Sequence, residues 1–353
     1  MTHPAQFQTQ PDAPPQQLRF HATGGEYFRI WIVNLLLTIV TLGIYSAWAK
    51  VRRNQYFYAS TELAGSSFTY HGNPIAILKG RIVAAVAFGV YMLAVQLSPG
   101  LAGIALLAMV GATPWFIMRS FQFNLYNSAY RGIRFRFIDD LSGAYITYLL
   151  RPMLNFVTAG LAVPFVHQRT KAWQINASRF GQARFSFDAE AGDFYKFYGC
   201  FLLAGGAGAG LTIWWLLSGT PVMAAAAGTI AGASVKAALV AIAVYGWMLL
   251  LAPLFINMAQ NMVWNHTSLE QHRFRSDVKW GRMLFIIVTN YLAVICTLGL
   301  FMPFARVRSM RYRIESLTLV PSGSLDDMLA GAGDDVSATG EGMADFMDLD
   351  FSL

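Results

Sequence analysis

The sequence predicts an all-α polytopic membrane protein with about seven membrane segments, three internal helix repeats and short β-strand motifs in the linkers. Two observations lead to this fold class. Of the 353 residues, 55% are hydrophobic and only 13% are charged, whereas soluble chains typically carry about 25% charged residues. Several stretches of about 18–23 residues are almost free of charge, long enough to cross a hydrocarbon core about 30 Å thick. These stretches are 28–49, 82–97, 101–118, 145–166, 195–217, 235–259 and 283–304.

The two ends of the chain differ from the membrane domain expected between them, residues 18–321. Residues 1–17 are polar and Pro-rich and do not resemble a secretory signal, so we expect a disordered tail. Residues 322–353 hold eight acids and no Lys or Arg, which predicts an acidic disordered tail. Because eight of the 19 acids lie there, residues 1–321 hold 26 basic and 11 acidic residues, a net charge of +15. In a membrane protein this surplus indicates contact with anionic lipid headgroups, and we expect no nucleic-acid partner.

The chain repeats a segment that begins at a shared threonine, Thr41, Thr158 or Thr297. A glycine follows at two positions, an aromatic residue at seven, a basic residue at nine and an arginine at eleven. This predicts repeat units at about 18–72, 127–188 and 265–321, separated by helix pairs at 80–118 and 194–259. Between the two apolar stretches of the second pair, the Ala/Gly-rich region 221–234 is expected to be an outer loop or a short extra helix.

A second motif, in which aromatic and polar residues alternate, flanks the repeat helices. It occupies residues 60–70, 127–137, 176–187 and 265–274, with half copies at 18–20 and 317–319. Alternation with a period of two among aromatic and β-branched residues predicts short strands.

Together these motifs resemble the YjgN-like family of bacterial inner-membrane proteins of unknown function. The resemblance covers most of residues 18–319. It rests on the Thr-Leu-Gly segments, on the Trp/Pro-Phe-Ala-x-Val-Arg residues that follow them, and on strands ending in Phe-x-Phe/Tyr. The second copy departs from the pattern at Arg151, Ala159 and His167. The resemblance implies a multi-pass protein of the bacterial inner membrane, and no reaction.

The topology of the three repeat helices has two solutions, because both ends of each helix are basic. If each helix spans once, the strand motifs alternate between the two sides of the membrane. If each helix enters and returns at its Thr-x-Gly, every motif lies on the cytoplasmic face, where basic linkers are expected. Glycine costs about 1 kcal/mol in a helix interior, which makes breaks at Gly43, Gly160 and Gly299 plausible.

Three polar residues share one repeat position, seven residues before the threonine: Asn34, Arg151 and Asn290. They form the candidate polar or anion site. A mid-membrane arginine costs about 3 kcal/mol and needs a partner or a water-filled cavity. The alternatives are that Arg151 extends to the membrane surface and that the two asparagines form hydrogen bonds between helices.

Five basic residues near the ends of the repeat helices are candidate headgroup contacts: Lys50, Arg52, Arg169, Arg306 and Arg308. Their functional interpretation is binding to lipid phosphates. The alternative is ordinary anchoring by the positive-inside rule.

The sequence contains no pattern that predicts catalysis, so we expect that the protein is not an enzyme and uses no cofactor. His266, Glu270 and His272 match no known metal-ligand spacing, and Cys200 and Cys296 lie within apolar stretches.

Two functions remain open. Internal repeats with polar residues at matching depths favour a transport or channel-type protein. The alternative is a non-catalytic membrane scaffold with a cytoplasmic strand-rich face, in which the acidic tail recruits a protein partner.

Overall fold

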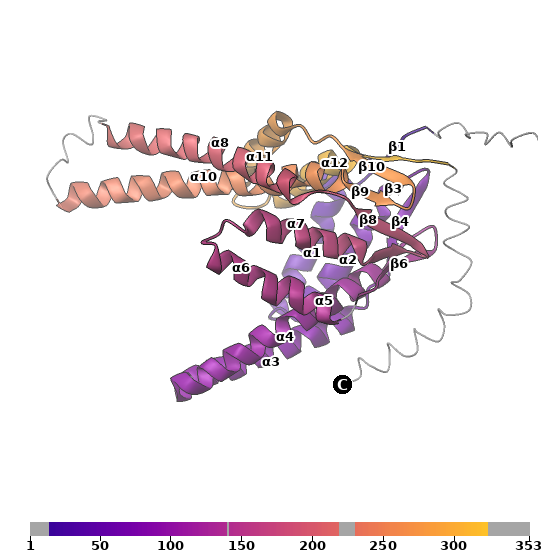
Figure 1. The fold of residues 1–353 in the computed structure, drawn as a ribbon, viewed down its shortest axis with the longest axis horizontal. Coiled ribbons are helices and arrows are strands. Elements are labelled where there is room, and N and C mark those ends of the chain that lie inside the picture. The colour runs from indigo at the N-terminus through magenta and orange to yellow at the C-terminus, as the bar shows by residue number, and fades with distance from the viewer. Residues whose placement is uncertain (1–13, 140, 219–229, 324–353) are drawn as a thin grey trace, which may run out of the picture.

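The computed structural model describes residues 14–139, 141–218 and 230–323. Most of the predicted N-terminal tail, all but the start of the predicted C-terminal tail and most of the Ala/Gly-rich region 221–234 lie outside these ranges. Within them, the chain combines long helices with one sheet, and the strands gather at one end of the molecule (Figure 1).

The sheet has 11 strands, and every neighbouring pair is antiparallel. Its order is β1-β11-β10-β9-β8-β7-β6-β5-β4-β3-β2. Only Leu18 separates the two edge strands along the chain, and its N–H donates to the carbonyl of Leu317 at 3.0 Å. The sheet therefore curls into a nearly closed barrel. The strands are β1 (Gln16–Gln17), β2 (Arg19–Phe20), β3 (Thr61–Leu63), β4 (Ser66–Tyr70), β5 (Ser128–Tyr130), β6 (Ile133–Phe137), β7 (Ser178–Phe180), β8 (Ala183–Phe187), β9 (Thr267–Leu269), β10 (His272–Ser276) and β11 (Leu317–Val320).

The all-α fold class is corrected by this sheet. The predicted strand motifs are strands, but they are not isolated pieces within the linkers, because each pairs with the next around the barrel. Because side chains alternate along each strand, the sheet has one apolar face, and a barrel buries that face. Aromatic residues point inward, where the ring centroids of Phe180 and Phe135 are 4.9 Å apart, and arginines such as Arg184 point outward. Tyr130 and Phe180 are almost fully buried in this core.

Two kinds of connection alternate around the barrel. At one end, tight turns join paired strands, and positive φ angles at Ala64, Gly65, Arg131 and Gly132 match the type I′ turns that suit twisted hairpins. The other connections are helical and lie between β2 and β3, β4 and β5, β6 and β7, β8 and β9, and β10 and β11. Because antiparallel neighbours alternate in direction, all five helical connections leave from, and return to, the same end of the barrel.

Four helices of the described ranges are long and apolar enough to cross a membrane: α3 (Pro74–Leu97), α4 (Pro99–Tyr126), α8 (Ala191–Leu217) and α10 (Ile230–Trp264). They form two antiparallel pairs, α3 with α4 and α8 with α10, which project from the barrel as two long arms (Figure 1). Ser98 joins the first pair, and its side chain accepts a hydrogen bond from the N–H of Leu101 as the N-cap of α4.

The other three predicted membrane segments are not single helices. Each breaks at its Thr-x-Gly, where Gly43, Gly160 and Gly299 have φ angles of 93°, 89° and 93°. The predicted breaks are thus present, and the count of about seven membrane segments is not confirmed. We call the resulting units the first, second and third hairpins. They comprise α1 (Gly24–Val40) with α2 (Ser46–Ala59), then α5 (Leu141–Tyr145), the π-helix η1 (Ile146–Leu150) and α6 (Arg151–Val157) with α7 (Val163–Asn176), and α11 (Trp280–Cys296) with α12 (Met302–Glu315).

The threonine that starts each turn explains why Thr-x-Gly recurs. The hydroxyl of Thr41 donates to the carbonyl of Leu37 at 2.7 Å and accepts from the N–H of Tyr45 at 2.9 Å. The N–H of Gly43 donates to the carbonyl of Thr38 at 2.8 Å. Thr158 and Thr297 make the equivalent contacts. These turns therefore satisfy much of their own backbone hydrogen bonding, which is a requirement for a turn placed in hydrocarbon.

Candidate functional site

An open cavity of about 670 Å³ lies where the first hairpin meets the third. Helix α1 packs against α12 here, and the rings of Phe28 and Phe304 lie 5.6 Å apart. Helices α1, α2, α3 and α12 all contribute to the lining. The barrel brings these distant parts of the chain together, because residues 16–20 pair with the strands of both the first and the third unit.

Four cationic side chains line this cavity, Lys50, Arg53, Arg81 and Arg306, and none of its described lining residues is acidic. Burial and then the guanidinium group of Arg306 lower the pKa of Arg53, and Arg81 acts in the same direction. The cations therefore repel one another, and an anion bound among them would relieve that repulsion. We call this cavity the cationic cavity.

Asn34 also lines the cationic cavity, and its amide is incompletely bonded. Its Oδ1 is buried without a hydrogen-bond partner among the described residues. Rotating the amide by 180° would instead present the NH₂ group, which can donate to an anion, and the choice between these orientations is set by the hydrogen-bond network. A buried polar atom of this kind is costly unless something binds it.

The equivalent residue of the third hairpin, Asn290, is fully used within its own hairpin. Its Nδ2 donates to the carbonyl of Ala305 at 3.2 Å and to the hydroxyl of Ser309 at 3.1 Å. Its Oδ1 accepts from Arg308 at 3.2 Å, and Arg308 also donates to the hydroxyl of Thr289 at 2.7 Å. Asn290 and Arg308 therefore connect α11 to α12, as in the interhelical alternative.

Arg151 and Arg169 meet in the second hairpin. Arg151 follows the π-helix and donates to the hydroxyl of Thr147 at 3.0 Å and to the carbonyl of Arg169 at 3.4 Å. Both arginines line a cavity of about 350 Å³ that also contains Asp139. The three residues of the predicted polar site thus lie in three separate hairpins, and they do not converge on one shared site.

Arg52, a predicted headgroup contact, does not line the cationic cavity, because it lies on a different face of α2 from the lining residues. Ser46, Ala49, Lys50 and Arg53 are spaced by three and four residues, so they share one face of the helix. Arg52 lies on another face and is exposed. Recurrence favoured Arg52 in the sequence, whereas position twelve after the threonine is charged only in the first unit, at Arg53. Arg53 was expected near the lipid phosphates but was not among the five candidate headgroup contacts, and Arg81 was missed.

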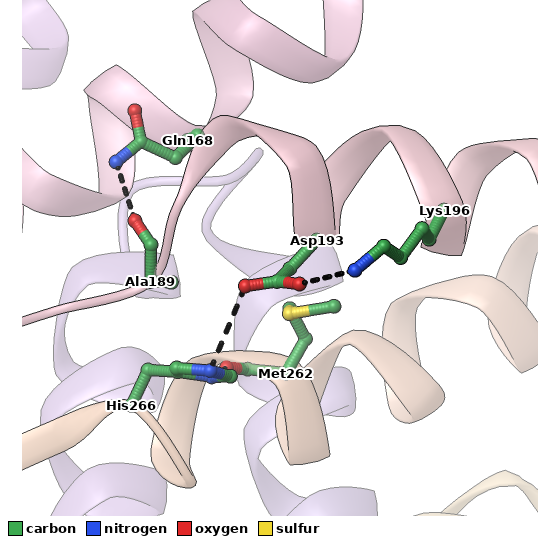
Figure 2. Close-up of polar contacts among 6 residues, drawn as sticks. All are labelled: Gln168, Ala189, Asp193, Lys196, Met262 and His266. Carbon is green, nitrogen blue, oxygen red and sulfur yellow. Dashed lines mark hydrogen bonds and ion pairs between the residues drawn. The ribbon is translucent and has the colours of Figure 1, made fainter.

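His266, one of the residues considered as a metal ligand from the sequence, has a packing role. His266 Nε2 lies 4.0 Å from Asp193 Oδ2, and its Nδ1 lies 2.9 Å from the carbonyl of Met262 (Figure 2). Asp193 also pairs with Lys196 at 3.2 Å in the first turns of α8. His266 therefore links the end of α10 to the start of α8.

The fold and these sites define a helical membrane protein with a strand-rich barrel at one end of its long helices. The chain belongs to the DUF898 family, described as bacterial protein of unknown function, whose family model matches residues 15–346. It is 30% identical over 162 residues to inner membrane protein YjgN of Escherichia coli strain K12, covering 44% of this chain and 39% of that protein. It is 29% identical over 144 residues to inner membrane protein YjgN of Salmonella typhimurium, covering 40% of this chain and 36% of that protein. The matches thus span less than half the length of these curated relatives. No solved structure matches the chain.

Proposed function

We propose that the protein is a non-catalytic scaffold of the bacterial inner membrane that binds the phosphate of anionic lipids in its cationic cavity. The barrel would lie on the cytoplasmic face. The two helix pairs would cross the membrane, and the three hairpins would enter only the leaflet nearest the barrel. The single observation that carries this topology is that every helical connection begins and ends at the same end of the barrel.

Charge and exposure support partial insertion of the hairpins. Residues 30–49, 152–166 and 283–305 contain no Asp, Glu, Lys or Arg. The turn residues Leu42 and Leu298 are each 95% exposed, which would be unfavourable in water and is favourable in hydrocarbon. From Arg29 to the end of α1, the helix rises about 17 Å, roughly half of a hydrocarbon core.

The same reasoning places the cationic cavity at the membrane surface. Arg81 is the last charged residue of α3 before the apolar residues 82–97. Its guanidinium group therefore marks the depth at which hydrocarbon begins, where lipid phosphates lie. The cavity is also lined by Trp31, Leu35 and Met302, which would contact the upper part of an acyl chain. The proposed headgroup contacts are therefore Lys50 and Arg306, which the sequence already suggested, together with Arg53 and Arg81.

Binding of phosphatidylglycerol tests this site. Near a membrane surface each Lys or Arg contributes about 1 kcal/mol, so we expect the Lys50→Gln/Arg53→Gln variant to bind this lipid about 30-fold more weakly. The measurement is native mass spectrometry of protein in neutral micelles titrated with phosphatidylglycerol. Glycerol phosphate in place of the lipid distinguishes a headgroup site from a site for a free phosphate ester.

The matched control removes two exposed charges that do not line the cavity, in the Arg52→Gln/Lys279→Gln variant. It should retain the affinity of the unaltered protein within about twofold, because exposed charges are screened. Equal losses of affinity in the two double variants would reject the cationic cavity as the lipid site.

Transport, the first of the two functions considered from the sequence, has less support. The polar residues that favoured it occupy three separate hairpins. The test is flux of an ion or lipid across the membrane of vesicles that contain the purified protein. Flux that is abolished in the Lys50→Gln/Arg53→Gln variant would favour a transport function over the scaffold function.

A further inference from the structure

Three arginines lie side by side on the outer face of the barrel. Arg136 of β6 is directly opposite Arg179 of β7, which is directly opposite Arg184 of β8. Residues opposite one another on antiparallel strands project from the same face, and like charges in that position are destabilising. We call these three residues the arginine row.

Within the row, Arg179 donates from Nη1 to the carbonyl oxygens of Asn176 at 2.5 Å and Ser178 at 2.8 Å, which are neutral partners and leave the positive charge in place. Glu270 is the acid beside the row, and its Oε1 accepts a hydrogen bond from the backbone N–H of Arg184 at 2.6 Å. Burial and then Arg184 lower the pKa of Arg179, whereas Glu270 acts in the opposite direction. Across the part of the chain that the structure describes, one carboxylate thus lies beside three guanidinium groups, and the row is suited to bind a further anionic partner.

The last strand before the C-terminal segment, β11, contributes Val320 to this same face. Val320 of β11 is opposite Arg273, and Arg273 is opposite Ser268, which in turn is opposite Ser186 of β8. The N–H of Ser322 donates to His272 Nδ1 at 3.2 Å. The exit point is three strands from Arg184, which corresponds to about 14 Å. The 30 residues beyond Gly323 can span several times that distance.

We propose that the acidic C-terminal segment, residues 324–353, docks onto the arginine row of its own barrel. The segment holds eight acids and no Lys or Arg, and its last eight residues alternate apolar and acidic side chains. Aspartate carboxylates can each accept two parallel hydrogen bonds from one guanidinium group. The docked segment relieves the repulsion within the row and shields it from other polyanions. This contact lies on the sheet and does not depend on the lipid site.

A proximity measurement tests the docking in the full-length chain. Ser186→Cys places a thiol on the outer face beside Arg184, and Ser352→Cys places one near the end of the segment, with Cys200 and Cys296 replaced by alanine. A short thiol–thiol crosslinker should join the two positions within one chain. The yield should fall about tenfold in the Arg136→Gln/Arg179→Gln/Arg184→Gln variant, since three ion pairs at the surface of the sheet are lost. It should fall similarly in 1 M NaCl, where the Debye length is about 3 Å.

Two controls keep the test decisive. The Arg52→Gln/Lys196→Gln/Lys279→Gln variant loses the same charge at exposed positions outside the row and should keep its crosslinking yield. A chain whose eight tail acids are replaced by Asn and Gln should lose its yield while its barrel is unaltered. Equal yields in the row variant and its control, or an unchanged yield with the neutral tail, would overturn the proposal. Crosslinks formed only between separate chains would also overturn it, in favour of an intermolecular partner for the tail.

Discussion

Replacing Phe180 with alanine is expected to lower the free energy of unfolding by about 3–5 kcal/mol, because truncating a buried phenylalanine leaves a cavity. Phe180 is 2% exposed at the centre of the barrel, with its ring 4.9 Å from that of Phe135 and 6.2 Å from that of Tyr130. Every helical connection is attached to this barrel, so its loss should disorder the whole assembly. Equilibrium unfolding in mixed micelles, followed by tryptophan fluorescence, measures the change.

The matched control is Phe156→Ala. Phe156 is 87% exposed at the end of α6 and contributes to no described core cluster. Its removal creates no internal cavity, so we expect a change below about 1 kcal/mol. A loss as large for Phe156 as for Phe180 would mean that the barrel interior is not the main core of the protein.

Replacing Leu42 with aspartate is expected to destabilise the folded, inserted state by about 3 kcal/mol, the cost of a carboxylate near the centre of a bilayer. Leu42 lies in the turn of the first hairpin with φ 50°, a conformation that aspartate tolerates better than leucine. The backbone therefore does not explain an unfavourable effect, and the membrane does. The measurement is the free energy of unfolding in lipid bicelles.

The same substitution at the turn between α3 and α4 should be nearly neutral. Ser98→Asp places the charge at the far end of a spanning pair, where water is expected, and aspartate is a good N-cap for α4. Equal destabilisation by Leu42→Asp and Ser98→Asp would contradict the proposed difference in depth between hairpins and spanning pairs.

Local patterns predicted much of the secondary structure but not the closure of the sheet. The alternation of residues 127–137 and 176–187 predicted strands that are present as β5 to β8. The pairing of Gln16 with Leu319 joins opposite ends of the chain, and no local pattern in the sequence specifies it. The count of about seven membrane segments is not confirmed, for a different reason. An apolar run such as 28–49 has the same composition whether it spans or turns back, and only the backbone at Gly43 distinguishes the two.

The candidate site was predictable to a similar extent. The sequence singled out Asn34, Lys50 and Arg306, and the structure brings all three into the cationic cavity. Arg81 was missed because it belongs to a different helix, α3, which packs against α2 after the β3–β4 hairpin reverses the chain. Asn290 shares the repeat position of Asn34, but its hairpin has Ser309 at the position of Arg53. The hydroxyl of Ser309 accepts a hydrogen bond from the Asn290 amide, so that amide is bonded within its own hairpin. The threefold repeat itself stays a prediction.

Thiol accessibility tests the central claim, that the hairpins turn back inside the membrane while the helix pairs cross it. Single cysteines at positions 42, 159, 298, 98 and 218, in a chain with Cys200 and Cys296 replaced by alanine, would be exposed in intact cells to a reagent that cannot cross the membrane. We predict rapid labelling at Ser98→Cys and Ser218→Cys, and no labelling at the three hairpin turns from either side, including in inverted vesicles. Labelling of Leu42→Cys, Ala159→Cys or Leu298→Cys from outside at the rate of Ser98→Cys would contradict the account.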